Sequence, residues 1–283
     1  MLKEKEQKAL FLVLLIIDGW GIAPDNVGNI FSLIKTKNYQ ELVSKYPAAA
    51  LLTSLNNNKI VSKSDNYFVI GTGDLAQKKT PSLIERLEKE KIKTLLISDQ
   101  EKYPEMNFFF TGRKKIANND ILVVKKDKFN RTTPLITEAL IKTIKKGEHK
   151  FITAAFSDLE LAVTSGDIKT AITTAEKIDE CLKKIIKAIL RRGGLAIITA
   201  AAGKAEAMIN PQTEIVNKKN TANPVPFILV GEKYEGQTIN FPEAPDGNLA
   251  LVQPAGDISN ITPTILKIFG LPESKEIKSK SFI

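Results

Sequence analysis

The stretch FLVLLIIDGWG, residues 11–21, decides the fold of this chain. Its seven apolar residues, Phe11–Ile17, are too few to cross a membrane, and no small-residue cleavage site follows them. They predict a buried strand. Asp18 follows this strand directly. Because ligands of an open parallel sheet bind beyond the carboxyl ends of its strands, Asp18 is a candidate residue of a cation or phosphate site. A carboxylate that only caps the following turn would give the same pattern.

Short apolar runs alternate with helical patterns along the rest of the chain. Strands are expected at Phe11–Ile17, Ala48–Leu52, Thr94–Ser98, Asn107–Phe110, Ile121–Val124, Phe151–Ala155, Leu195–Ala200 and Pro226–Val230. Helices are expected at Ser82–Lys91, Pro134–Lys146, Asp167–Arg191 and Thr262–Phe269. Continuously apolar strands between helices predict an α/β fold with three layers, in which a mainly parallel sheet has helices on both faces. The polar stretches Leu55–Asn66 and Ile209–Asn223 are expected to be loops. No linker or repeat divides the chain, so we expect residues 1–283 to form a single domain.

Composition excludes several classes of protein. Hydrophobic residues make up 43% of the chain and charged residues 26%, which is ordinary for a soluble globular protein. Cys181 is the only cysteine, so no disulfide forms within the chain, and a reducing, cytoplasmic location is expected. His149 is the only histidine, which excludes any site that needs two or three imidazole ligands.

The net charge of +9 favours anionic partners. Most of the surplus is lysine spread along the whole chain, without an arginine-rich or aromatic-interleaved block. A solvated lysine-rich surface is therefore the favoured interpretation, and nucleic-acid binding remains an alternative.

Several segments resemble one known family in its own order. They are DGWGIAPDNVGNIFSLIKTKNYQELVSKYPAAAL (18–51), IGTG (70–73), EKYPEMNFFFTG (101–112), TSGDIKTAITTAEKIDECL (164–182), AIITAAAGKAEAM (196–208), TANPVPFILVG (221–231) and ITPTILKIFGLP (261–272). Together they resemble the cofactor-independent phosphoglycerate mutases of the alkaline phosphatase superfamily. The resemblance implies an alkaline-phosphatase-like core, two divalent metals (usually manganese) held by Asp and His residues, and a serine nucleophile.

The resemblance also implies that most metal ligands are lost. Asp18 is kept, and Glu160 keeps a carboxylate where the family has Asp. The other ligand positions hold residues that are weak metal donors or none: Thr164, Ala201, Ala202 and Asn220. The two-manganese site of the family is therefore not expected. We expect no cofactor, or at most one weakly bound Mg²⁺ or Mn²⁺ at Asp18 and Glu160.

The nucleophile is altered as well. Lys63 lies at the position of the family's serine, and Ser62 and Ser64 on either side are weak nucleophile candidates. No catalytic residue of the family is therefore expected to be intact.

Two further features follow from the resemblance. The family carries a large substrate-binding domain after the IGAG-like turn, and the helix and strand of residues 82–98 replace it here. Lys102 matches the family's lysine that contacts phosphate. Without metals, Lys102 is expected either to pair with Asp18 or Glu160 or to bind a small anion.

Three functions remain open at the level of sequence. The first is a degenerate, non-catalytic mutase-like domain that serves as a binding, regulatory or assembly module, with an unknown protein or a small anion as its partner and no membrane. The second is a residual metal-dependent phosphatase or mutase that uses Asp18, Glu160, Asp158 and one of the two serines. The third is a basic protein that binds a polyanion.

Overall fold

The computed structural model describes residues 11–53, 62–76, 80–114, 120–126, 131–239, 241–272 and 276–283. Its centre is an eight-stranded sheet in the order β4-β3-β5-β1-β6-β7-β2-β8. The strands are β1 (Leu12–Ile17), β2 (Ala48–Leu52), β3 (Thr94–Asp99), β4 (Asp120–Val124), β5 (Phe151–Phe156), β6 (Leu195–Thr199), β7 (Val225–Val230) and β8 (Gly256–Asp257). Only β7 is antiparallel to its neighbours, β6 and β2, and every other pair is parallel. The predicted mainly parallel sheet is thus confirmed.

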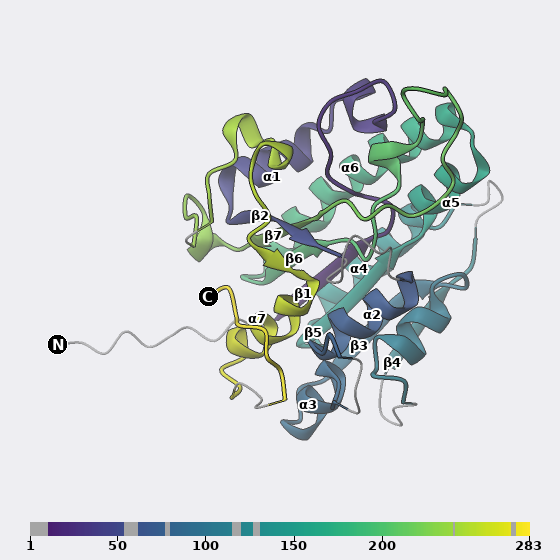
Figure 1. Ribbon diagram of the computed structural model, residues 1–283. Coiled ribbons are helices and arrows are strands. Elements are labelled where there is room, and N and C mark those ends of the chain that lie inside the picture. The colour runs from purple at the N-terminus through teal and green to yellow at the C-terminus, as the bar shows by residue number, and fades with distance from the viewer. Residues whose placement is uncertain are drawn as a thin grey trace.

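Helices cover both faces of this sheet (Figure 1). They are α1 (Lys37–Lys45), α2 (Lys63–Thr72), α3 (Leu83–Lys89), α4 (Thr133–Lys146), α5 (Asp158–Ser165), α6 (Ile168–Leu190) and α7 (Ile261–Ile268). The long helix α6 packs against α1, α4 and α5, whereas α2 packs against α3 and α7. In Figure 1, α1, α5 and α6 lie above the sheet, and α3 and α7 lie below it. The predicted three layers are present. None of the helices in the described ranges is both long and apolar enough to cross a membrane.

Local signals explain where several helices begin and end. Helix α3 begins after a capping box, in which the Ser82 hydroxyl accepts from the Glu85 amide and the Glu85 carboxylate accepts from the Ser82 amide. Helix α6 begins after Asp167, whose side chain accepts from the Thr170 amide. Helix α4 ends at Gly147, where the left-handed φ of 73° favours glycine. These helices lie within two residues of their predicted bounds.

Two sequence predictions are wrong. Asn107–Phe110 is not a strand: residues 107–109 belong to a π-helical turn, η2 (Glu105–Phe109), and Phe110 directly follows it. Met106 and Phe110 are buried while Phe108 is exposed, and this spacing of four residues suits a helix rather than a strand.

Within the predicted loop Leu55–Asn66, residues 63–66 form the start of α2, which Ser62 caps by accepting from the Asp65 amide. Residues 54–61 lie outside the described ranges. The stretch Ile209–Asn223 contains only isolated bridges and is a loop as predicted.

The order of the strands determines which residues meet at the carboxyl edge of the sheet. Strands β3, β5 and β1 are consecutive neighbours and run in the same direction. The segments that follow them start with Gln100, Ser157 and Asp18 and therefore lie side by side. This edge is where ligands of open parallel sheets bind.

Candidate functional site

The centre of the candidate site is Lys102, which lies between two carboxylates. Its Nζ contacts Oδ2 of Asp18 and Oε2 of Glu160. Asp18 follows β1, Glu160 lies in the first turn of α5 after β5, and Lys102 lies in the turn after β3. The backbone amide of Lys102 donates to Oδ1 of Asp99 at 2.9 Å, which fixes this turn. The side chains of Asp18 and Lys102 are both 1% exposed, so the ion pair is almost completely removed from water.

Asp18 has two further donors. The Tyr67 hydroxyl, which is fully buried, donates to Oδ2 at 2.9 Å. The backbone amide of Ala201 donates to Oδ1 at 3.3 Å. Asn66 holds the Ala201 segment in place, because its Nδ2 donates to the Ala201 carbonyl at 2.7 Å. Both oxygens of the Asp18 carboxylate are thereby hydrogen-bonded, as a buried charge requires.

Two more lysines converge on Glu160. Lys63 donates to both carboxylate oxygens, at 2.9 and 3.1 Å, and its Nζ lies 3.6 Å from Oε1 of Glu105. Nζ of Lys204 lies 3.8 Å from Oε1 of Glu160 and donates to the Thr164 hydroxyl at 2.8 Å. Three ammonium groups from α2, the turn after β3 and the segment after β6 thus surround one carboxylate. The site is a closed network of lysines and carboxylates.

The charges of this network shift the pKa values of Lys102 and Glu160 towards their charged forms. Burial alone would raise the pKa of Glu160, but Lys102 and Lys63 outweigh it and hold this pKa at about 2. Burial would lower the pKa of Lys102, but the charges of Asp18 and Glu160 raise it above its usual value. Burial also raises the pKa of Asp18, because Lys102 only partly offsets desolvation and the charge of Glu160. For Lys204, burial and the neighbouring lysine charges lower the pKa. Lys102 is therefore a fixed internal cation.

The residues present do not fit the two-metal centre that the resemblance implies. The ammonium of Lys102 occupies the space between the two carboxylates that could otherwise hold a divalent cation. Ala201 and Ala202 offer no side-chain lone pair where the family has ligands. Among the described residues, no group of three or more His, Cys, Asp or Glu side chains could hold a metal ion. A metal here would have to displace a buried, doubly paired ammonium.

The nucleophile candidates lie at the start of α2. Ser62 is the helix cap: its hydroxyl accepts from the Asp65 amide at 3.1 Å and donates to the Asp65 carboxylate at 2.7 Å. Ser64 is half-buried, and its hydroxyl makes no hydrogen bond within the described part of the chain. Lys63 directs its ammonium to Glu160. Lys63, which the resemblance aligns with the family's serine, is thus a charged group that is already paired.

The remaining predicted residues are partly dispersed. Asp158 is not directed to the cluster, because its carboxylate accepts from the amides of Thr132 and Thr133 at the start of α4. Thr164 joins the cluster through its contact with Lys204. Asn220 is half-buried, and its side chain has no hydrogen bond to any described residue.

Sequence reasoning missed three members of the network: Tyr67, Lys204 and Glu105. Each is brought to the site by folding and not by closeness in sequence; Tyr67, for example, contacts Asp18, from which it is separated by 49 positions. Glu105 and Lys204 had a weak signal, since they lie in the resembling segments EKYPEMNFFFTG and AIITAAAGKAEAM.

Comparison with known proteins identifies the superfamily of the chain. The model of the Metalloenzyme superfamily matches residues 11–273, so the chain belongs to this superfamily. A 2,3-bisphosphoglycerate-independent phosphoglycerate mutase of Francisella tularensis is 29% identical over 196 residues, which cover 66% of this chain and 36% of that protein. The chain thus matches only about a third of the length of this relative.

Solved structures place the fold among alkaline-phosphatase-like proteins. The alkaline phosphatase of the Antarctic bacterium TAB5 superposes with a TM-score of 0.63 at 12% identity, covering 94% of this chain and 99% of that one. The phosphoglycerate mutase of Leishmania mexicana superposes with a TM-score of 0.56 at 21% identity, covering 69% of this chain and 38% of that one. The predicted core is confirmed, and the smaller size fits the absence of the inserted domain.

Proposed function

We propose that this chain is a non-catalytic member of the Metalloenzyme superfamily that keeps the mutase-like core as a binding, regulatory or assembly module. One observation carries the proposal: the ammonium of Lys102 lies between Asp18 and Glu160. Phosphoryl transfer in metal-dependent enzymes depends on a divalent cation that polarises the phosphate and activates the nucleophile. A lysine can neutralise the carboxylates, but it cannot coordinate a phosphate oxygen or a hydroxyl oxygen as a metal ion does.

The alternative of a residual enzyme has less support from the geometry. It would use Asp18, Glu160 and Asp158 as oxygen ligands, with Ser62 or Ser64 as nucleophile. Asp158 is engaged by two backbone amides at the start of α4, and Ser62 is engaged as a helix cap. Asp158 and Ser62 could take these roles only by breaking existing hydrogen bonds, whereas the Ser64 hydroxyl has no hydrogen bond to a described residue.

The proposed partner is a protein or a small anion, and the proposed location is the cytoplasm. The net charge of +9 supports an anionic surface on the partner. Binding of an anion by Lys102 itself would require this lysine to leave its two carboxylates. The buried free Cys181 supports a reducing compartment. We also propose that the described ranges act as a single domain, since one sheet organises them all.

An activity assay tests the proposal. Purified protein is incubated with 3-phosphoglycerate and, separately, with a chromogenic phosphate ester, each with Mn²⁺ or Mg²⁺ in excess. We expect turnover equal to that of a buffer blank with wild-type and Asp18→Asn protein alike. Turnover above the blank that is lost in Asp18→Asn would overturn the proposal and establish the residual enzyme. Turnover that is unchanged in Asp18→Asn would indicate either a contaminating enzyme or a site that needs only the Glu160 carboxylate. The same assay with Glu160→Gln distinguishes them, because only turnover by this protein would be lost in that variant.

A further inference from the structure

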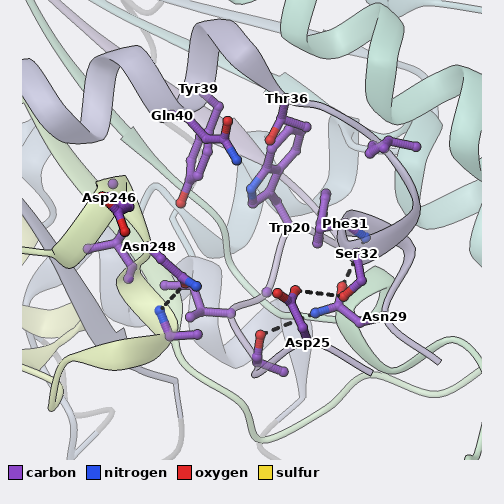
Figure 2. A pocket seen from close by; sticks show the side chains of 17 residues that line it. Trp20, Asp25, Asn29, Phe31, Ser32, Thr36, Tyr39, Gln40, Asp246 and Asn248 are labelled. Carbon is purple, nitrogen blue, oxygen red and sulfur yellow. Dashed lines mark hydrogen bonds between the residues drawn. The ribbon is translucent and has the colours of Figure 1, made fainter. Parts of the chain in front are cut away.

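A cavity lined by Trp20 lies apart from the lysine cluster, because no residue of that cluster lines it. It has a volume of about 370 Å³ and lies between η1 (Ile30–Leu33), the start of α1 and residues 246–250 (Figure 2). Trp20, Phe31 and Tyr39 form an aromatic wall, with ring centroids 4.6 Å apart for Trp20 and Phe31 and 5.0 Å apart for Trp20 and Tyr39. Such a wall suits the apolar part of a small ligand.

Two carboxylates border this cavity, and Figure 2 shows Asp25 and Asp246 on opposite sides of it. Neither makes an ion pair with any residue in the described ranges. Asp25 accepts one hydrogen bond, from the Ser32 hydroxyl at 2.8 Å. No lysine or arginine lines the cavity, although the chain has 41 of them. The cavity is thus a negative site on a positively charged protein.

The loops that carry the carboxylates are held in place. Asp246 has a φ of 52°, and Gly247 follows with a φ of 70°. A Cβ on Gly247 would lie 2.7 Å from Oγ of Ser44 and 3.0 Å from the carbonyl oxygen of Gln40, so this turn packs closely on α1. On the other side, the Asn29 side chain donates to the Ala23 carbonyl at 3.1 Å. The backbone that carries each carboxylate is therefore held in place, while both Asp residues are exposed to solvent.

A threonine without a side-chain hydrogen bond to a described residue also lines this space. Thr36 lines the cavity, is only 5% exposed and makes no side-chain hydrogen bond within the described residues. A bound ligand, or a water that bridges to one, would supply this hydrogen bond.

From this geometry we propose that the cavity binds an aliphatic diamine or polyamine, with one ammonium at Asp25, one at Asp246 and the alkyl chain against the aromatic wall. A phosphorylated ligand would be repelled by both carboxylates, and no cation is present to receive it. A neutral polyol would leave both charges without a counterion. A monoamine would neutralise only one of them.

Isothermal titration calorimetry with putrescine as the probe tests the proposal. We expect one site per chain, tighter binding of spermidine or putrescine than of butylamine, and no binding of butanediol. Asp25→Asn and Asp246→Asn should each weaken putrescine binding by about fivefold, and the double variant by about twenty-five-fold, because each removes one partly exposed ion pair. Asn tolerates the left-handed backbone at position 246, so that turn is retained. Glu243→Gln, which removes a nearby carboxylate that does not line the cavity, should bind like the wild type.

Three results would overturn the proposal: no heat with putrescine or spermidine at millimolar concentration, equal binding of butanediol and putrescine, or equal weakening in Glu243→Gln and in the two Asp variants. The last result would show a diffuse charge effect instead of a site. Because no residue of the lysine cluster is changed, the outcome is independent of the proposed loss of catalysis.

Discussion

Replacing Lys102 by Met tests whether this lysine is the internal cation of the site. Met keeps most of the side-chain volume but removes the charge between Asp18 and Glu160. Glu160 would keep Lys63, whereas Asp18 would keep only its uncharged donors, Tyr67 and the amide of Ala201. Removing one partner of a buried ion pair costs about 3–5 kcal/mol. We therefore expect Lys102→Met to lower the free energy of unfolding by about 3–5 kcal/mol at neutral pH.

The size of this loss should depend on pH in a defined direction. In the variant, burial raises the pKa of Asp18 even further above its unfolded value of 3.8, because Lys102 no longer opposes desolvation. The folded state then binds more protons than the unfolded state, so its stability falls as pH rises through this window. In the wild type, the pKa of Glu160 is lowered to about 2 from its unfolded value of 4.5. This shift contributes stability that is fully present above pH 4.5 and is lost as the pH falls towards 2. Both effects make the difference between wild type and variant smaller near pH 4 than near pH 8.

Urea unfolding followed by the fluorescence of Trp20 measures this difference. Trp20 is the only tryptophan and is 2% exposed, so its emission reports loss of the core. Lys63→Met is the matched control: it removes another ammonium from Glu160, but the Lys63 side chain is 21% exposed, so we expect a loss of only about 1 kcal/mol. A loss below about 1 kcal/mol in Lys102→Met, or an equal loss at both pH values, would refute the argument that a buried charge is left unpaired.

Three further predictions concern the fold. Gly71→Ala should lower the free energy of unfolding in urea by about 3 kcal/mol, because the added Cβ would lie 1.9 Å from the Phe110 carbonyl oxygen. Gly236→Ala is the control: no atom lies within 4 Å of its Cβ, but its φ of 73° should still cost about 1–2 kcal/mol. Equal losses in the two variants would contradict the close approach at Gly71. Ser82→Ala should lower the free energy of unfolding by about 1 kcal/mol through loss of the capping box, and an unchanged midpoint would show that this box does not stabilise α3. Cys181, which is 3% exposed, should react with a thiol reagent only as fast as the protein opens, and rapid labelling under native conditions would show that α6 packs more loosely.

Much of the fold could be predicted because burial and periodicity agree along most of the chain. The run Phe11–Ile17 is apolar throughout, and β1 is buried on both faces at the centre of the sheet. The prediction of a strand at Asn107–Phe110 is wrong because a short apolar run has no periodicity that distinguishes a strand from a helical turn. The start of α2 was missed because its first residues are polar, although Ser62 and Asp65 have the spacing of a helix cap.

The site could be predicted only in part. The sequence predicts Asp18 at the carboxyl edge of the sheet because it directly follows a strand, and a pair with Lys102 is one of the alternatives that the resemblance leaves open. Tyr67 and Lys204 join the site through contacts between distant segments, which no local pattern specifies. The order β3-β5-β1, which brings the ends of these three strands together, is likewise a property of the folded chain.

The most direct test of the central claim is a Mn²⁺ titration followed by the electron paramagnetic resonance signal of the free ion. If Lys102 replaces the metal, the signal should rise with added Mn²⁺ as it does in buffer, for the wild type and for Asp18→Asn alike. Loss of signal equivalent to one or two Mn²⁺ per chain in the wild type, restored in Asp18→Asn, would contradict the account.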